Sequence, residues 1–301
     1  MRIVSLLPSA TEILCAIGLA DSIVGISHEC DYPLEIRERP RVTRSQFPAE
    51  LPSHEIDQRV QGSIARQESL YAIEAKHLAA LAPDLVVTQR QCSVCAVGET
   101  DALRALGQVG SRARVVSLAA SRFEELPEDI RKLGQATDSV EQAEAVVHQL
   151  RTRLEIVRDH TRNPHRPRVF CLSWFNPLMA AGHWMSQMVE LAGGEDRLGA
   201  RAGSSTILYP VTLEGYAPEV ILLLPCGFTQ SRTRREWESV RSQSFWANLP
   251  AVRAGRIFVL EGSLFHRPSP RLVDGVELLA TLLHPERWGG SHNQTAAWRV
   301  A

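Results

Sequence analysis

Residues 2–12 read RIVSLLPSATE, a short apolar run that a proline ends and a helical pattern follows. Comparable β-branched runs recur at residues 23–27, 85–88, 114–118, 169–173, 220–224 and 257–260, with helical patterns between them. Alternation of strands and helices is typical of parallel sheets that are covered by helices. The sequence therefore predicts an α/β fold with Rossmann-like parallel sheets.

The first helix is expected to begin at a capping box, Ser9-Ala10-Thr11-Glu12. In such a box the side chains of Ser9 and Glu12 satisfy each other's free backbone donors. The helix should end near Gly18, and a further short helix is expected near residues 53–60, inside a long excursion over residues 39–72.

One long helix is predicted in the middle of the chain. Apolar residues recur there at spacings of three and four, which is the pattern of an amphipathic helix of about 20 residues: Val140, Ala143, Val147, Leu150, Leu154 and Val157. The segment NPHRP at residues 163–167 then breaks it. We expect two lobes, residues 1–138 and 163–290, joined by a linking helix within residues 139–162 and followed by a polar tail at 291–301. The pattern APDLVV at 82–87 returns as APEVIL at 217–222, so the lobes should be similarly built.

The composition limits the class of protein. The chain has 301 residues, of which 44% are hydrophobic, and its formal net charge is -1, so it has no basic field for nucleic acid or an anionic membrane. No apolar run reaches the ~18 residues of a membrane span. The N-terminal residues lack the pattern of an export signal, which predicts a cytoplasmic location and reduced cysteines. The alternative is a periplasmic or otherwise exported importer component, if the true start lies upstream and encodes an export signal. No hydrolase, phosphate-loop or dinucleotide motif follows a strand, which favours a binding protein over an enzyme.

The residues that follow strands are the candidates for a ligand site, because ligands bind beyond the carboxyl ends of parallel strands. Aromatic walls with a few polar groups suit a large planar ligand. The predicted ligand-binding residues are Ser9, His28, Tyr32, Gln89, Trp174, Phe175, Trp184, Phe265, His266 and Arg267.

Cysteines follow three of these strands. Cys92 and Cys95 form a Cys-x-x-Cys pair, and with Cys30 they are the predicted metal ligands, completed by His28 or Cys226. Such a set suits zinc, an iron-sulfur cluster or the metal of a bound ligand. A redox pair and small buried hydrophobic residues are the alternatives.

Several motifs resemble those of the cobalamin- and iron-siderophore-binding proteins of ABC importers, the class III substrate-binding family. They include residues 2–12, Gly25-Ile26-Ser27, Asp31-Tyr32-Pro33 and Pro83-Asp84-Leu85-Val86, and in the second half Asn176-Pro177, Ala181-Gly182, Ala192-Gly193-Gly194-Glu195 and Arg267-Pro268-Ser269-Pro270-Arg271. The resemblance covers nearly residues 1–286. It implies two lobes joined by one rigid helix, with a small ligand in the interlobe cleft, in first place cobalamin or a related corrinoid or metal chelate.

The chain also departs from the family's pattern. In the cobalamin branch one glutamate on each lobe docks on the transporter permease. Glu214 matches the second, but the first falls on or near Lys76, with Glu74 as a displaced substitute, which argues against docking. The tryptophans of the family's pocket fall here near Gln89 and Ser117. The resemblance therefore points to a cytosolic cobalamin-binding-like subgroup. The alternative is a cytosolic metalloprotein or enzyme that uses a cysteine-ligated metal or iron-sulfur cluster in the same cleft.

Overall fold

The computed structural model describes residues 1–46, 51–66, 68–90, 96–162, 165–287 and 296–300. The chain divides into two compact units. Unit 1 contains residues 1–120 and 124–149, and unit 2 contains residues 121–123 and 150–301. Each unit contains a sheet with parallel strands, as the alternating pattern predicted.

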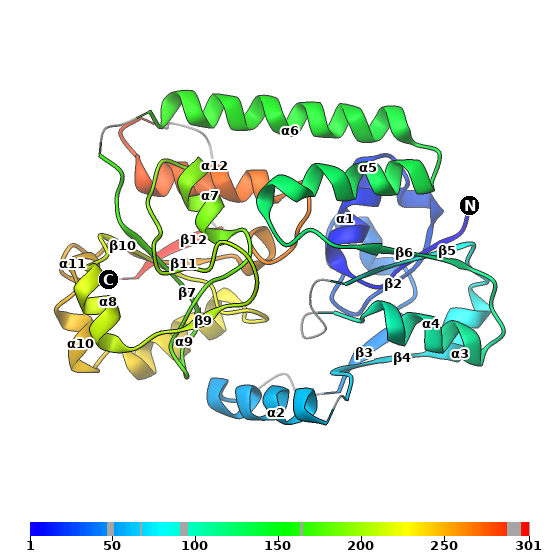
Figure 1. Ribbon diagram of the computed structural model, residues 1–301, viewed down its shortest axis with the longest axis horizontal. Coiled ribbons are helices and arrows are strands. Elements are labelled where there is room, and N and C mark those ends of the chain that lie inside the picture. The colour runs from blue at the N-terminus through cyan, green and yellow to red at the C-terminus, as the bar shows by residue number, and fades with distance from the viewer. Residues whose placement is uncertain (47–50, 67, 91–95, 163–164, 288–295, 301) are drawn as a thin grey trace. The chain divides into compact units, whose positions relative to one another are not determined.

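Unit 1 is built on a four-stranded parallel sheet of order β2-β1-β5-β6. Its strands are β1 (Ile3–Ser5), β2 (Ile23–Ile26), β5 (Leu85–Gln89) and β6 (Arg114–Leu118). Helices α1 (Pro8–Ala16) and α5 (Leu126–Ala136) lie on one face, and α3 (Ala75–Ala80) and α4 (Glu99–Gln108) lie on the other (Figure 1). Val4 and Val86 of the sheet pack against Leu78 and Leu106 of these last two helices. Because all four strands are parallel, their carboxyl ends lie at the same end of the sheet.

The first helix begins two residues earlier than the capping box requires. Its N-cap is Leu7, and Pro8 is its first residue. Proline suits that position because its fixed φ is helical and its missing N–H would have no partner there. Ser9 is consequently buried inside the first turn and makes no cap hydrogen bond, so the prediction of a capping box was wrong. The helix ends at Ala16, close to the predicted end at Gly18.

A two-stranded antiparallel ribbon stands apart from the main sheet of unit 1. It pairs β3 (Thr43–Ser45) with β4 (Tyr71–Ile73), and the intervening chain carries α2 (Ser53–Ala65). The short helix expected near residues 53–60 is therefore present and longer than predicted. Only Ser53 and Ser63 are buried in it, so most of α2 faces solvent.

Unit 2 contains a six-stranded sheet of order β12-β11-β10-β7-β8-β9. The central strands β7 (Val169–Trp174), β10 (Val220–Leu223) and β11 (Ile257–Leu260) are parallel. Strands β8 (Met179–Ala180), β9 (Thr206–Ile207) and β12 (Ala297–Val300) run antiparallel to their neighbours. The two edges of the sheet are β12 and β9, and β8 lies between β7 and β9. None of these three strands was predicted from the sequence, and β12 lies in the expected polar tail.

Helices cover both faces of this second sheet (Figure 1). One face carries α7 (Met185–Leu191) and α12 (Leu272–Leu283), and the other carries α8 (Pro210–Tyr216), α9 (Gln230–Val240), α10 (Ser244–Ala247) and α11 (Pro250–Arg253). Trp237 and Trp246 meet edge to face, with ring centroids 5.0 Å apart, inside the core of the second face. A core of this kind gives unit 2 its own hydrophobic stabilisation.

A single uninterrupted helix, α6 (Val140–His160), connects the two units. Of the predicted apolar positions, Ala143, Val147, Leu150 and Val157 are buried. Val140, in contrast, is 50% exposed, because it lies at the first residue of the helix. The prediction of one long linking helix is confirmed.

Candidate ligand-binding site

An aromatic and cationic stack lies at the carboxyl ends of two neighbouring strands of unit 2. Trp174 is the last residue of β7, and Phe228 follows β10. Their ring centroids are 5.1 Å apart with the planes tilted by 60°. The guanidinium carbon of Arg232 lies 3.6 Å from the centre of the Phe228 ring, a cation–π contact. Phe228 is 7% exposed, so the accessible aromatic surface of the stack is that of half-buried Trp174, with the Arg232 charge beside it.

The start of α9 holds Arg232 in this place. Thr229 is the N-cap of the helix, and its hydroxyl accepts a hydrogen bond of 3.3 Å from the Arg232 backbone N–H. Arg232 is therefore in the first turn, four residues after Phe228, and one turn of helix brings its side chain back over the ring.

A second group in unit 2 contains His183, Trp184 and Phe265. The indole N–H of Trp184 donates a 2.6 Å hydrogen bond to the Phe265 carbonyl, and Trp184 is only 5% exposed. His183 has a left-handed backbone with φ of 56°. A Cβ atom on the preceding residue, Gly182, would lie 2.5 Å from the Gly203 carbonyl oxygen, so only glycine fits the turn that presents the histidine.

The imidazole ring of His266 is held by a hydrogen bond to a backbone carbonyl group. Its Nε2 lies 2.7 Å from the Leu224 carbonyl oxygen, and because a carbonyl only accepts, Nε2 carries the proton. Burial lowers the pKa of His266 to about 4, opposed by that hydrogen bond. Burial also lowers the pKa of His183, whose Nδ1 has no hydrogen-bond partner among the described residues. Both imidazoles are neutral at pH 7.

The two groups adjoin at Gly262. A Cβ atom there would lie 3.1 Å from Cδ2 of His266 and 3.9 Å from the Phe228 carbonyl oxygen. Seven residues of unit 2 thus form one set, here called the strand-end cluster: Trp174, His183, Trp184, Phe228, Arg232, Phe265 and His266.

In unit 1 a polar network follows β2. The Thr43 hydroxyl accepts a 3.0 Å hydrogen bond from the His28 backbone N–H, lies 2.7 Å from His28 Nδ1, and donates to Ser27 at 3.3 Å. This arrangement places the ring proton on Nδ1. Nε2 is buried without a hydrogen bond to the described residues, with a Glu29 carboxylate oxygen 3.5 Å away. Burial lowers the pKa of His28, and the Glu29 charge opposes this shift.

The cysteines are not gathered into a metal site among the described residues. Cys30 is 1% exposed, and its sulfur lies 3.1 Å from the Thr11 hydroxyl, which donates onward to Ser5. Cys226 belongs to unit 2 and is exposed. Cys92 and Cys95 lie outside the described residues. Within the part of the chain that is described, no three histidine, cysteine or acidic side chains form a group that could hold a metal ion.

The other predicted ligand residues differ in their surroundings. Gln89 ends β5 and is 4% exposed, Phe175 is 6% exposed, and Ser9 is buried within α1. Tyr32, at 45% exposed, is open to solvent. Arg267 follows His266 in the strand-end loop and is half-buried.

The two predicted docking glutamates also differ. Glu214 is exposed on α8. Glu74 is the N-cap residue of α3, and its carboxylate accepts a 2.8 Å hydrogen bond from Arg44 on β3. Glu74 is therefore engaged in holding α3 next to the ribbon, whereas Glu214 is available to a partner surface.

Phe228 and Arg232 were missed as site residues by the sequence reasoning. Their spacing in the sequence could have indicated the contact. When a helix begins between an aromatic residue and an arginine four residues later, the arginine side chain can lie over the aromatic ring. The start of that helix at Thr229 had not been predicted.

Comparisons with known proteins show the family and the fold of the chain. The periplasmic binding protein family matches residues 3–264. A vitamin B12-binding protein of Vibrio cholerae is 26% identical over 288 residues, 94% of this chain and 88% of the relative. An uncharacterized ABC transporter substrate-binding lipoprotein of Bacillus subtilis, YvrC, is 23% identical over 95% of this chain and 80% of its own. A periplasmic heme binding protein from Pseudomonas aeruginosa has the same fold, with a TM-score of 0.71 at 21% identity, covering 95% of this chain and 93% of its own.

These relatives lend no support to the expected cytoplasmic location, since they are described as periplasmic or as a lipoprotein. No helix in the described part of the chain has the length and apolarity to cross a bilayer. The match over most of the sequence, the two α/β units and the linking helix together identify the chain as a member of the periplasmic binding protein family, whose members bind small ligands.

Proposed function

We propose that this protein binds a large, planar, metal-centred ligand, in first place cobalamin or a related corrinoid, through the strand-end cluster of unit 2. The observation that carries the proposal is the stack of Trp174, Phe228 and Arg232 at the carboxyl ends of β7 and β10. Aromatic faces provide large contact areas at a small cost in side-chain entropy, and the neighbouring polar groups fix the orientation of a ligand.

The polar members of the cluster suit the rim of such a ligand. His183 is neutral at pH 7 and has an unpartnered ring nitrogen among the described residues, which a ligand amide or water would satisfy. The Arg232 guanidinium can donate to carbonyl or carboxylate oxygens while its other face stays on Phe228. In unit 1, His28, Tyr32 and Gln89 stay predicted contacts.

Similarity to the vitamin B12-binding protein of Vibrio cholerae supports a corrinoid as the first candidate. Haem, which the structural relative from Pseudomonas aeruginosa binds, is the second candidate, because its flat ring and carboxylates also fit an aromatic and arginine surface. A cysteine-bound metal or iron-sulfur cluster has no support among the described residues.

The proposal is tested by absorbance titration of the full chain with hydroxocobalamin and, separately, with haem. We expect a single site for the corrinoid and at least tenfold weaker binding for Trp174→Ala, because stacking and buried apolar area together contribute about 1.5–3 kcal/mol. The matched control is Trp298→Ala on β12, which removes a tryptophan that is 48% exposed and outside the cluster. Tighter binding of haem than of hydroxocobalamin would reassign the ligand. Affinity weaker than millimolar for both, or equal losses in the two variants, would refute the site.

A further inference from the structure

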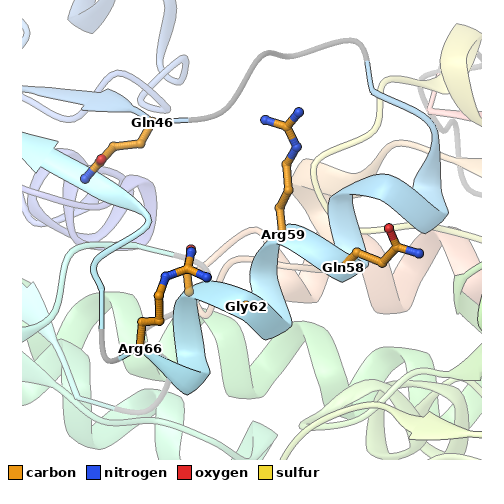
Figure 2. A pocket seen from close by; sticks show the side chains of 6 residues that line it. Gln46, Gln58, Arg59, Gly62 and Arg66 are labelled. Atoms are coloured by element: carbon orange, nitrogen blue, oxygen red, sulfur yellow. The ribbon is translucent and has the colours of Figure 1, made fainter.

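A second, polar pocket lies entirely within unit 1, on the exposed helix α2. It has a volume of about 380 Å³ and is lined by Gln46, Gln58, Arg59, Gly62, Ser63 and Arg66. Figure 2 shows Arg59 and Arg66 rising from the same side of α2, with Gln46 across from them at the end of β3. None of the lining residues is acidic or apolar.

Three of these side chains have no partner within the described part of the chain. Gln58, Arg59 and Ser63 line the pocket, and none of them forms an ion pair or a side-chain hydrogen bond with another described residue. Ser63 is 5% exposed as a whole residue, and it faces the pocket from the inner side of α2. Glu55, one helical turn before Arg59, does not pair with it, although that spacing favours ion pairs on helices. The Arg59 guanidinium and the Gln58 amide therefore keep their donors for a ligand or for water.

Gly62 explains how Arg66 reaches the pocket. A Cβ atom at Gly62 would lie 3.2 Å from a terminal guanidinium nitrogen of Arg66. The arginine therefore bends back along α2 over the glycine, toward Arg59. Glycine in a helix interior is unfavourable relative to alanine, and here it makes room for a second guanidinium in the same pocket. Arg66 also holds Glu68 through its Nε at 2.8 Å, which leaves its terminal nitrogens for a ligand.

We propose that this pocket is a binding site for a small polyvalent oxyanion, a molecule with two or more carboxylate or phosphate groups. Guanidinium groups pair with such oxygens through two parallel hydrogen bonds. The amides of Gln46 and Gln58 and the Ser63 hydroxyl supply neutral donors around them. The formal charge of the whole chain is -1, so anion binding here comes from the pocket and not from a general positive field. The site uses no residue of the strand-end cluster and does not rest on the proposed function.

The test is calorimetric titration of the full chain, at low ionic strength, with citrate and with pyrophosphate. We expect at least one of the two to bind with a dissociation constant below about 1 mM, a free energy beyond about -4 kcal/mol, and acetate to bind at least tenfold more weakly. The preferred probe distinguishes a carboxylate from a phosphate ligand. The double variant Arg59→Gln/Arg66→Gln should lose at least tenfold in affinity. The control Arg112→Gln/Arg235→Gln removes the same charge from exposed positions outside the pocket and should change nothing.

Two further variants separate binding from folding. Gly62→Ala should raise the melting temperature, because alanine favours the helix, while it weakens binding three- to tenfold by displacing Arg66. Glu68→Gln should tighten binding by releasing Arg66. Dissociation constants above 10 mM for both probes, or equal affinity in the wild type and the double arginine variant, would overturn the site.

Discussion

Two neutral histidines beside aromatic rings define the chemistry of the strand-end cluster at the level of single residues. Burial lowers the pKa of both His183 and His266, and the charged form of His183 would lower the pKa of His266 further. A polar but uncharged surface binds a large ring without the cost of removing water from a full charge. Arg232 is the exception, since its guanidinium is charged and is held by the electrostatic attraction of the Phe228 ring face.

The pKa of His266 predicts a pH dependence of stability. Its pKa is about 4 in the folded protein, against 6.5 in the unfolded chain, so the unfolded state binds the proton more tightly. This stabilisation is complete above pH 6.5 and is lost as the pH falls toward 4, by up to about 3 kcal/mol. Urea unfolding at a series of pH values measures it. His266→Gln keeps a donor for Leu224 and should flatten the curve between pH 6.5 and 4, and an unchanged curve would show that His266 is not the titrating group.

The carboxylate of Asp129 is expected to stabilise unit 1. Its carboxylate accepts hydrogen bonds from the backbone N–H groups of Ala119 and Ala120, which follow β6, and the residue is 5% exposed. Asp129→Ala should destabilise the protein by about 1–3 kcal/mol, because the backbone N–H groups of exposed Ala119 and buried Ala120 both lose their acceptor. The control is Glu128→Ala, an exposed neighbour on the same helix. Equal unfolding free energies for the two variants would contradict this role.

Individual site residues were only partly predictable. Trp174, Phe265 and His266 were chosen as candidates because they follow predicted strands, and the position after a strand is a property of the local pattern. Trp184 follows β8, which was not predicted, and was chosen as an aromatic residue. The pairing of Cys30 with Thr11 joins a loop to a helix 19 residues earlier, which no local pattern reveals. Cys92 and Cys95 lie outside the described residues, so the metal site that their spacing suggested stays a prediction.

At the scale of elements, α6 is fastened to α12 by a half-buried arginine. Arg153 donates 2.6 Å hydrogen bonds to both Asp274 and Glu277, and a second bond of 2.9 Å makes the contact with Glu277 bidentate. These bonds raise the pKa of Arg153. Paired geometry of this kind is stronger than an ordinary surface ion pair.

We expect Arg153→Met to lower the unfolding free energy by about 1–2 kcal/mol at low salt, because two carboxylates lose their partner. The matched control is Arg151→Met, which removes an exposed arginine from the same helix and should be nearly neutral. Denaturant unfolding with and without 1 M NaCl measures both variants. A loss no larger in Arg153→Met than in the control would show that the clamp contributes nothing.

The sequence identified the long or strongly apolar elements and missed the short ones. The parallel strands are buried on both faces, so their β-branched runs are unmistakable. Strands β8 and β9 have two residues each, which is too short for a recognisable sequence pattern. Strands of this length form only through pairing with a neighbouring strand. The prediction of a capping box was wrong for a local reason. Pro8 is favoured at the first position of a helix, so the helix begins there and not after Ser9.

At the scale of the whole molecule, each unit has its own sheet and core, and one continuous helix connects them. The resemblance to the class III substrate-binding family anticipated this arrangement, and the match over residues 3–264 establishes it. The ligand depends on a few side chains at strand ends, which can change while the fold persists. This is why the fold follows from the sequence, whereas the ligand has to be measured.

The most direct test of the central claim is isothermal titration calorimetry of the full chain with hydroxocobalamin. The account predicts one site per chain with a dissociation constant below about 10 μM, since a ring buried on the cluster should gain at least about 7 kcal/mol. It also predicts a negative heat-capacity change from the burial of apolar surface. Binding weaker than 1 mM for both hydroxocobalamin and haem would contradict it.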